Sequence, residues 1–474
     1  MAERSQGVRR LVDRATPRSA CRAPIFGPVK LSVIGCGYLG AVHAASMAEL
    51  GHEVVGVDVD VERVARLSRG EAPFYEPGFA ELLRRGVDGG RLRFTTEMGD
   101  VAGARVHFVG VGTPQRESGY AADLSHLDAA MGSLLAVMGE HPVAGALVVG
   151  KSTVPVGTAA RLADWCAREG VDATVVWNPE FLREGYAVQD TLTPDRVVYG
   201  LPEDRVAGEA ARDLLDEVYA GVLSHGMPRL VTNYQTAELV KVAANSFLAT
   251  KISFINAIAE LCEATGADVT RLAEALGHDE RIGPKFLRAG VGFGGGCLPK
   301  DIRAFMARAG ELGVDQALTF LREVDAINQR RRQHAVALAE RHFGGSVERR
   351  RIAILGAAFK PDSDDLRDSP ALYVATRLVG QGADVVVTDP IALPGLHARY
   401  PHIQTAPNAR AACVDAELVM LLTEWSDFTS LEPDQLGSVV KERAIIDGRN
   451  ALDPGRWEAA GWSYRGMGRA STTW

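Results

Sequence analysis

The segment GVGFGGGCLPKD (290–301) holds the residue best suited to covalent chemistry, a cysteine at the end of a glycine-rich loop. Five glycines lie between Gly290 and Gly296, and backbone without side chains lets a bulky ligand pack closely. Cys297 lies just before a predicted helix, so the helix N-terminus and Lys300 are expected to lower the pKa of its thiol. A thiolate attacks carbonyl carbons, so we expect Cys297 to be a nucleophile. Four other cysteines are expected to be buried and inert: Cys36, Cys166, Cys262 and Cys413.

A second pattern, GCGYLG (35–40), is a glycine turn between a short apolar run and a stretch with helical spacing. Gly35 permits the tight turn, Gly37 lets the backbone approach a pyrophosphate, and Gly40 allows close packing of helix on strand. The start of the helix offers free N–H groups to that anion. The pattern therefore predicts a dinucleotide-binding turn.

Asp58 ends the second predicted strand, 18 residues after Gly40. A carboxylate there accepts hydrogen bonds from both hydroxyls of a ribose and repels a 2′-phosphate, so NAD is expected rather than NADP. Asp60 is the alternative carboxylate, but it is expected to lie beyond the strand end. Arg63 is expected to lie beside the adenosine or, as an ordinary helical arginine, in solvent.

A dinucleotide site and a nucleophilic cysteine in one chain together indicate two successive oxidations. A hydride leaves a carbinol to give an aldehyde, the thiol adds to the aldehyde, and a second hydride leaves the thiohemiacetal. The resulting thioester is hydrolysed to a carboxylate. A two-electron hydroxy-acid dehydrogenase would not need Cys297.

The elements that position these residues alternate between strands and helices. After the glycine turn, strands are predicted within 105–112, 146–153 and 173–179, with helices between them, as in a parallel sheet covered on both faces. One long helix is predicted over 236–266, and its apolar residues exceed one stripe, so a partner is expected to cover it. A second α/β unit begins near 349. We predict two Rossmann-like doubly wound parallel-sheet domains joined by the long helix, divided into a disordered basic extension (1–29), an NAD-binding domain (30–232), a central helical domain for dimerisation and catalysis (233–332) and a C-terminal domain (333–474).

Composition excludes several other classes of protein. The chain has 474 residues with 46% apolar and 24% charged side chains, and its net charge of -8 argues against a general nucleic-acid binder. Its six cysteines lack the spacing of zinc ligands, so neither a metal nor a disulfide framework is expected, and free thiols fit a reducing cytoplasm. No membrane span or secretory signal is predicted.

With these features the sequence resembles the nucleotide-sugar dehydrogenases, the UDP-glucose/GDP-mannose dehydrogenase family. The resemblance runs from about Val29 to Arg469 and is carried by motifs spread along the chain: GCGYLG (35–40), FYEPG (74–78), VGTP (111–114), KSTVPVGT (151–158), NPEFLREG (178–185), PDRVV (194–198), the helix at 239–260, GFGGGCLPKD (292–301), FKPDSDDLRDSP (359–370), TEW (423–425) and DGRN (447–450). It implies four-electron oxidation of C6 of UDP-glucose, with NAD as cofactor and a homodimer or higher homo-oligomer as the assembly. It also implies that the C-terminal domain binds the UDP-sugar.

The resemblance implies roles for residues on the long helix and beside Cys297. Lys241 and Asn245 are four residues apart, hence on one helix face, where an ammonium and an amide could hold the oxygen on which negative charge develops. Asp301 is implied to orient the water or the thiol's partner. Without the resemblance, Asp301 would be read as a helix cap.

Two carboxylates and a threonine are implied to lie at the reacting carbon. Thr153 and Glu184 lie beside it and Glu180 is close by, with a carboxylate managing water in the hydrolytic step. The residues implied to bind NAD are Gly35, Gly37, Tyr38, Leu39, Gly40, Asp58, Arg63, Thr113, Thr153, Glu184, Lys300 and Arg367.

The substrate is implied to lie against Phe181 and Leu182, with Arg288 and Lys360 as cations and Phe286 packing on the sugar or base. Arg281 resembles an arginine that reaches the neighbouring subunit's substrate, and Arg449 is a further candidate. The full implied set of substrate contacts is Phe181, Leu182, Glu184, Lys241, Asn245, Arg281, Phe286, Arg288, Gly294, Lys360 and Arg449.

The cysteine loop departs from the family pattern at one point. Relatives usually have Ser before the cysteine and an aromatic residue after it, where this chain has Gly296 and Leu298. Leu in that place also occurs in GDP-mannose dehydrogenases. Relatives that act on N-acetylated sugars typically have His before the cysteine and lack the Lys-Asp pair that this chain has at Lys300 and Asp301. UDP-glucose is therefore favoured, GDP-mannose is the alternative, and N-acetylated sugars are less favoured. A non-catalytic NAD or nucleotide-sugar sensor is disfavoured, because all the implied catalytic residues are present.

Overall fold

The computed structural model describes residues 27–117 and 119–469. The predicted basic extension therefore lies outside the described residues except for its last three. Of these, Val29 is buried and its N–H donates to Nδ1 of His52. The folded part of the chain therefore includes Val29, which the prediction had assigned to the extension.

The first sheet has eight strands, and their alternation with helices produces the topology predicted from the sequence. Its strand order is β3 (Leu92–Thr95), β2 (Glu53–Val57), β1 (Lys30–Ile34), β4 (Val106–Val109), β5 (Ala146–Gly150), β6 (Ala173–Trp177), β7 (Val197–Leu201) and β8 (Arg229–Asn233). All neighbours are parallel except β6 and β7, which pair antiparallel. The first six strands have the 3-2-1-4-5-6 order of dinucleotide-binding folds, whose ligands bind where the strand order reverses, here between β1 and β4.

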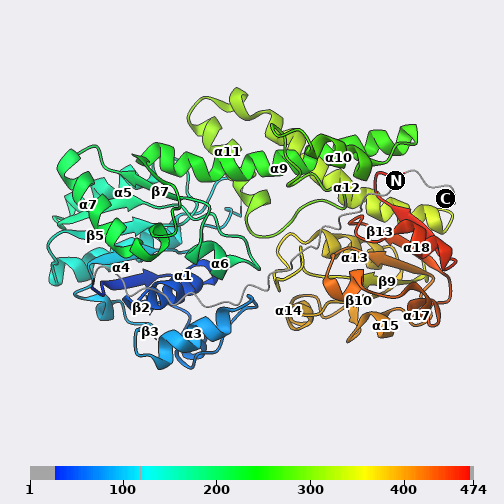
Figure 1. The fold of residues 1–474 in the computed structure, drawn as a ribbon, viewed down its shortest axis with the longest axis horizontal. Helices are drawn as coiled ribbons and strands as arrows, with labels where there is room; N and C mark the ends of the chain where they lie inside the picture. The colour runs from blue at the N-terminus through cyan, green and yellow to red at the C-terminus, as the bar shows by residue number, and fades with distance from the viewer. Residues whose placement is uncertain (1–26, 118, 470–474) are drawn as a thin grey trace, which may run out of the picture.

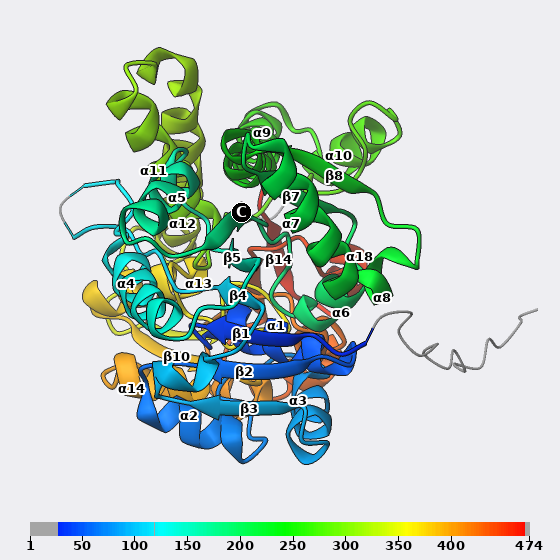
Figure 2. The same ribbon diagram turned by 90° about the vertical axis from the view of Figure 1, so that its left-hand side faces the viewer.

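Helices cover both faces of this sheet, as Figure 2 shows. One apolar cluster lies beneath α1 (Tyr38–Glu49), α3 (Phe79–Asp88) and α7 (Arg205–Val218), and another lies beneath α4 (Ser125–Glu140) and α5 (Thr158–Arg168). Because both faces are buried, Ala146–Gly150 is apolar throughout instead of alternating, and Val106–Val109 is buried throughout, with its one polar residue, His107, hydrogen-bonded to Ser32. The shorter elements of this part are α2 (Val61–Ser68), η1 (Met98–Val101), α6 (Ala187–Leu192) and α8 (Ala220–Leu223).

Helix α9 (Tyr234–Thr265) connects the two halves of the molecule, as Figure 1 shows. Asn233 caps its start through a hydrogen bond from the N–H of Thr236, and Gly266 ends it in the left-handed conformation. Helices α10 (Val269–Gly277), α11 (Leu298–Glu311) and α12 (Phe320–His342) pack against it, with the short turn η2 (Asp315–Leu318) between the last two.

Helix α9 is long and apolar enough to cross a membrane by length and composition alone, with a mean hydropathy of 1.3 over its most apolar window. Its position argues otherwise, because it packs against α11, α12 and β7. It also buries Glu238, Lys241 and Asn245, which are polar groups with partners inside the protein. We therefore interpret α9 as a core helix.

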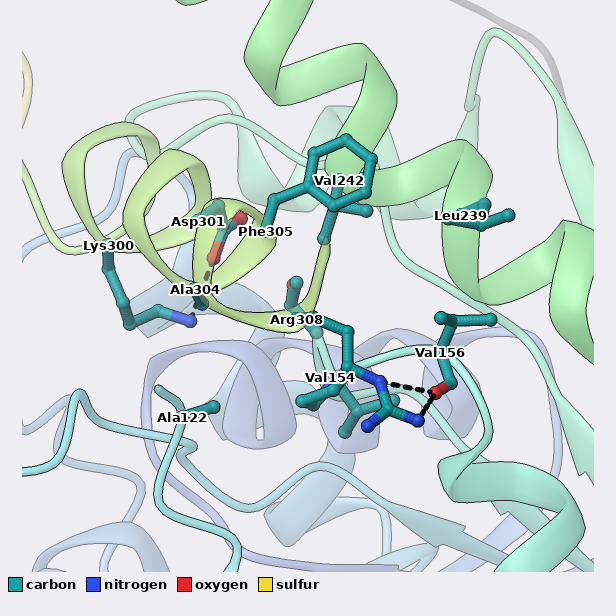
Figure 3. Close-up of a pocket in the computed structure, with 12 residues that line it drawn as sticks. Ala122, Val154, Val156, Leu239, Val242, Lys300, Asp301, Ala304, Phe305 and Arg308 are labelled. Atoms are coloured by element: carbon teal, nitrogen blue, oxygen red, sulfur yellow. Dashed lines mark hydrogen bonds and ion pairs between the residues drawn. The ribbon is translucent and has the colours of Figure 1, made fainter. Parts of the chain in front are cut away.

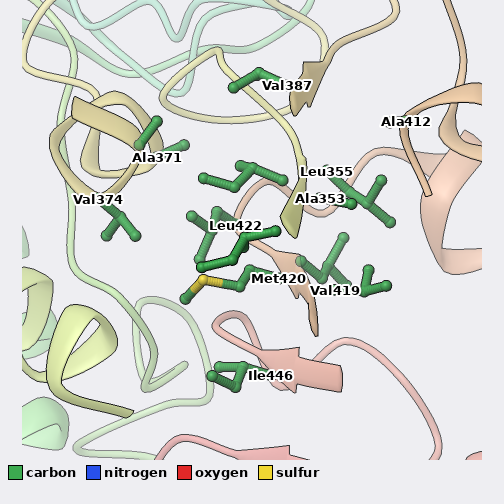
Figure 4. Packing of buried hydrophobic residues seen from close by; sticks show 14 of the residues in the cluster. Ala353, Leu355, Ala371, Val374, Val387, Ala412, Val419, Met420, Leu422 and Ile446 are labelled. Atoms are coloured by element: carbon green, nitrogen blue, oxygen red, sulfur yellow. The ribbon is translucent and has the colours of Figure 1, made fainter. Parts of the chain in front are cut away.

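The second sheet repeats the same order with six parallel strands: β11 (Gln404–Thr405), β10 (Asp384–Thr388), β9 (Arg351–Leu355), β12 (Leu418–Leu421), β13 (Ala444–Asp447) and β14 (Ser463–Gly466). Its core is built from small and branched side chains such as Ala353, Val419 and Ile446, which Figure 4 shows packed together. The covering helices are α13 (Pro370–Gly380), α14 (Leu393–Arg399), α15 (Ala409–Ala412), α16 (Ser426–Thr429), α17 (Pro433–Gly437) and α18 (Pro454–Ala459).

The predicted fold class, two parallel-sheet domains joined by a long helix, is confirmed. Helix α12 crosses the predicted domain boundary at residues 332 and 333, and its residues Ala335, Val336, Leu338 and Ala339 belong to the core of the second sheet. The central helices and the second sheet therefore share one helix.

Candidate active site

The glycine turn after β1 has the shape that a dinucleotide requires. Gly35 adopts a positive φ of +86°, and a Cβ on Gly40 would lie 1.8 Å from the carbonyl oxygen of Gly35, so both must be glycine. A Cβ on Gly37 would meet nothing within 4 Å. This backbone is therefore open on the side where a pyrophosphate approaches, and the turn fits the cofactor predicted for it.

Asp58 lies directly after β2 and is 6% exposed. It accepts hydrogen bonds from the N–H of Cys36 at 2.7 Å and from Nη1 of Arg63 at 2.9 Å. Asp60, the alternative carboxylate, instead caps α2 by accepting from the N–H of Arg63 at 3.0 Å. Asp58 is thus the carboxylate fixed beside the glycine turn, and Arg63 lies against it.

The other predicted cofactor residues frame the same edge of the sheet. Leu39 is half-buried in the first turn of α1, and the hydroxyl of Thr113 donates to the carbonyl oxygen of Thr153 at 2.7 Å. That hydrogen bond joins the loop after β4 to the loop after β5, which are neighbours in the sheet. Thr113 and Thr153 therefore share one edge of the predicted site.

Cys297 lies directly before α11, as the sequence predicted, and it is the solvent-exposed member of the five free cysteines in the described part of the chain. Protein nevertheless surrounds its thiol closely. Burial and the carboxylates of Asp301 and Glu180 raise the pKa of this thiol to about 12, with Lys241 acting in the opposite direction. The predicted lowering of this pKa is therefore wrong, because Lys300 forms an ion pair with Asp301 at 2.8 Å and two acidic groups face the sulfur.

The two helical residues predicted to hold an oxygen are buried on one face of α9. Nζ of Lys241 lies 2.9 Å from Oε1 of Glu180, and the two side chains are 6% and 13% exposed. Burial lowers the pKa of Lys241, but Glu180, Cys297 and Asp301 together more than offset this, so the pKa lies above its usual value. Nδ2 of Asn245 donates to Oδ2 of Asp301 at 2.6 Å. An ammonium and an amide thus lie beside the cysteine's helix, each held by a carboxylate.

Glu184 lies where the first sheet meets the second. Its carboxylate accepts from the hydroxyl of Ser363 at 3.1 Å and from Nη2 of Arg367 at 3.4 Å, and its carbonyl oxygen accepts from Nζ of Lys360 at 2.5 Å. Burial, followed by the charge of Asp365, raises the pKa of Glu184 to about 7. Burial lowers the pKa of Lys360. A carboxyl that changes protonation near neutral pH is suited to proton transfer.

The glycines of the cysteine loop serve protein packing. A Cβ on Gly292 would lie 2.4 Å from Oδ1 of Asn328, one on Gly294 would lie 2.2 Å from the carbonyl oxygen of Asp368, and one on Gly295 would lie 2.8 Å from the Phe359 ring. Gly290 and Gly296 are similarly filled by Gly448 and Arg367. These five positions must therefore be glycine, because α12 and the second sheet's loops occupy the space that a side chain would need. The approach of a ligand to this loop stays a prediction.

Helix α12 holds this loop through residues that the sequence analysis missed. Asn328 accepts from the N–H of Phe293 at 2.8 Å and donates to its carbonyl at 3.0 Å, and Arg332 donates to the same carbonyl at 2.6 Å. Arg331 donates to the carbonyl of Gly290 at 3.3 Å. These side chains are fully or almost fully buried. The signal available in the sequence was the polar residues Asn328, Arg331 and Arg332 on a helix face that is otherwise apolar. The sequence does not show which distant loop these side chains bind.

Arg449, like the residues of α12, holds the cysteine loop through hydrogen bonds to backbone carbonyls. Its guanidinium donates to the carbonyls of Leu422, Gly292 and Phe359 at 2.7, 2.9 and 3.0 Å. It therefore ties the cysteine loop to the second sheet. Its contact with substrate stays a prediction.

Some of the remaining predicted substrate residues lie near Lys241 or the first core, and the others lie on the surface. Phe181 lies near Lys241, whose Nζ is 5.8 Å from the ring centroid, and Leu182 packs against the first core. Arg281 is largely exposed and paired with Asp279, Phe286 has a φ of +64°, and Arg288 is exposed. The contacts of these last three residues with substrate stay predictions.

A small cavity of about 20 Å³ lies between the Thr153 loop and α11 (Figure 3). Asp301 and Lys300 line it on one side and Val154 on another, and Arg308 closes it by donating to the carbonyl of Val156 at 2.8 and 3.1 Å. This volume suits about one water molecule. No group of three or more His, Cys, Asp or Glu side chains placed to hold a metal occurs among residues 27–117 and 119–469.

Comparison with known proteins places this geometry in a family. Residues 29–222, 235–330 and 353–454 match, in order, the NAD binding domain, the central domain and the UDP binding domain of the UDP-glucose/GDP-mannose dehydrogenase family. The chain belongs to this family, and it is an NAD-dependent dehydrogenase of nucleotide-sugar metabolism.

Individual relatives share nearly the whole chain. It is 41% identical to a UDP-glucose 6-dehydrogenase of Pseudomonas aeruginosa over 93% of this chain and 98% of that protein. It is 39% identical to one of Rhizobium meliloti, over 93% of this chain and the whole of that protein. The solved structure of a UDP-glucose dehydrogenase from Pyrobaculum islandicum superposes with a TM-score of 0.84 at 38% identity, covering 94% of this chain and 98% of that one.

Proposed function

We propose that the protein oxidises C6 of UDP-glucose to the carboxylate of UDP-glucuronate in two oxidations and one hydrolysis, with Cys297 as the nucleophile. The observation that carries this proposal is the placement of an exposed cysteine beside the buried Lys241, Asn245 and Asp301, at the junction of the two sheets. The open backbone at Gly37 and the carboxylate of Asp58 are the groups proposed to hold NAD, which would supply the hydride acceptor for each oxidation.

In the first half, the C6 alcohol loses a hydride and a proton and becomes an aldehyde. Lys241 and Asn245 stabilise the negative charge that develops on the C6 oxygen. The thiol of Cys297 then adds to the aldehyde carbon, and the oxygen takes a proton. Because the thiol is protonated at neutral pH, its proton must leave as the bond forms, and Asp301 is the nearby carboxylate proposed to receive or direct it.

In the second half, the thiohemiacetal loses a hydride and a proton and becomes a thioester. Water cleaves the thioester, which gives the carboxylate and returns the thiol. Glu184, with a pKa raised to about 7, is proposed to take the proton of this water, with Glu180 supporting the charge on Lys241.

The proposal is tested by measuring how many molecules of NADH form per molecule of UDP-glucose consumed. The native protein is expected to form two NADH per UDP-glucose, and Cys297→Ala to fall far below two while still binding NAD, because the glycine turn is unchanged. A native yield of one NADH, or native-like turnover by Cys297→Ala, contradicts covalent catalysis. Faster turnover of GDP-mannose than of UDP-glucose would assign the alternative substrate.

We also propose a homodimer formed through α9. Phe247, Phe254 and Leu261 are 66%, 50% and 60% exposed and lie seven residues apart, so they form one apolar stripe suited to a second copy of the helix. Arg281 is proposed to reach the partner's substrate, since its side chain is 88% exposed on its own chain. Sedimentation showing a fully active monomer at assay concentration contradicts this. Free cysteines suit the cytoplasm, which is the proposed location.

A further inference from the structure

The FYEPG motif (74–78) has no part in the chemistry proposed above, yet it is packed between the two halves of the site. The Phe74 ring lies 4.6 Å from that of Tyr38 and 5.0 Å from that of Phe79, measured between centroids. The N–H of Tyr75 donates to Oδ2 of Asp364, in the loop that follows β9, at 3.1 Å. The motif therefore contacts the cofactor turn on one side and the second sheet's loops on the other.

Glu76, at the centre of this motif, is a buried carboxylate that accepts hydrogen bonds from Tyr38 and from the loop that follows Glu184. It is 5% exposed. Oε2 accepts from the N–H of Gly185 at 2.7 Å and from the hydroxyl of Tyr38, and Oε1 accepts from the N–H of Ala187 at 2.7 Å. Both oxygens thus accept hydrogen bonds from backbone N–H groups of the Glu184 loop.

The partners of Glu76 are the chain neighbours of the two functional segments. Tyr38 follows Gly37, the open glycine of the cofactor turn, and Gly185 follows Glu184. Glu76 therefore connects these segments through two hydrogen bonds, although they are 147 residues apart in sequence.

The opposite side of the Glu184 loop has no space for adjustment. Gly185 has a φ of +79°, and a Cβ there would lie 2.8 Å from the carbonyl oxygen of Asp362. The loop is held between Glu76 on one side and Asp362 and Lys360 on the other. A change at Glu76 must therefore move Glu184 or break contacts with the second sheet.

We propose that Glu76 is a positioning residue for Glu184, and that the hydroxyl of Tyr38 couples occupancy of the cofactor turn to the placement of that carboxylate. This inference rests on the proposed role of Glu184. Glu76→Gln tests it with little change in shape, because the amide keeps one acceptor and turns an N–H₂ group toward a backbone N–H. Tyr38→Phe removes the coupling hydroxyl alone. Tyr464→Phe is the matched control, since it removes a similar buried hydrogen bond to Asp447 in the second sheet.

The first measurement is steady-state kinetics with UDP-glucose across pH. Glu76→Gln is expected to lower kcat by roughly 10–100-fold with little change in the KM for UDP-glucose, as for a misplaced catalytic group. The midpoint of the rise in kcat near pH 7 is expected to move to lower pH, because a loosened Glu184 regains water. Tyr464→Phe is expected to leave kcat and this midpoint unchanged.

The second measurement needs no turnover. Hydrogen exchange of the amides of Gly185, Ala187 and Val188 is followed with and without NAD. NAD is expected to slow this exchange in the native protein and not in Tyr38→Phe, while still protecting residues 35–40 in both. Equal slowing in both proteins, or a Glu76→Gln enzyme with native kcat and pH profile, overturns the proposal. If the native protein does not oxidise UDP-glucose, the proposed function fails, whereas the exchange result still decides the coupling.

Discussion

The protonation state of Cys297 gives the sharpest test of the physical reasoning. Its thiol has a pKa raised from 9.0 to about 12, chiefly by burial and next by Asp301. At pH 8 the thiolate fraction is then about 10⁻⁴, against about 10⁻¹ for a thiol of pKa 9, so alkylation is expected to be about 10³-fold slower than in the unfolded chain. Asp301→Asn removes one acidic neighbour, so the pKa falls and alkylation at fixed pH becomes faster.

Iodoacetamide labelling followed by peptide mass spectrometry measures this directly. The rate at Cys297 is expected to rise about tenfold per pH unit from pH 7 to 10 without a plateau. Denatured protein supplies the rate of the unperturbed thiol. Asp325→Asn is a matched control. Asp325, on α12, pairs with Arg303 of α11 at 3.0 Å, and it is not among the main charges that shift the pKa of Cys297.

A plateau below about pH 8.5, or labelling faster than in denatured protein, would refute the argument from burial. It would show instead that the helix N-terminus and the cations dominate, as the sequence pattern alone suggested. An unchanged rate in Asp301→Asn would remove Asp301 from the account and leave burial as the cause.

Three further outcomes are expected. The kcat of the native enzyme should rise with pH around 7, the pKa to which burial raises Glu184, and Glu184→Gln should lose this rise together with most activity, as seen in a pH–rate profile. Burial opposes the charge of Glu263, yet His334 and Arg331 lower its pKa to about 2. Glu263→Gln should therefore reduce the free energy of unfolding by about 3 kcal/mol near pH 5, and the difference should shrink as pH falls toward 2, because only the unfolded carboxylate is then protonated. Gly292→Ala should cost about 2–4 kcal/mol in urea titrations, because φ is +100° and the methyl would meet Asn328, whereas Gly90→Ala, with positive φ but open space, should cost about 1 kcal/mol.

Local patterns in the sequence determined the features that depend on neighbouring residues. The glycine turn, the strand before it and the helix after it lie within a few residues of one another, so their geometry follows from backbone sterics alone. Asp58 follows its strand directly and therefore lies at the sheet edge beside that turn. The alternation of strands and helices likewise predicted both parallel sheets, because short parallel connections require a crossover helix.

Only the tertiary structure decided the electrostatics and the supports of the site. Lys300 is next to Asp301 in the chain and pairs with it, while the cation that most lowers the pKa of Cys297 is Lys241, from another helix. The glycines of the cysteine loop are required by Asn328 and by the second sheet, which no local pattern indicates. Spacing along a chain predicts which residues share a turn or a helix face. The pKa of a buried group and the packing of a loop depend instead on charges and atoms within a few ångströms, and folding brings these from distant parts of the sequence.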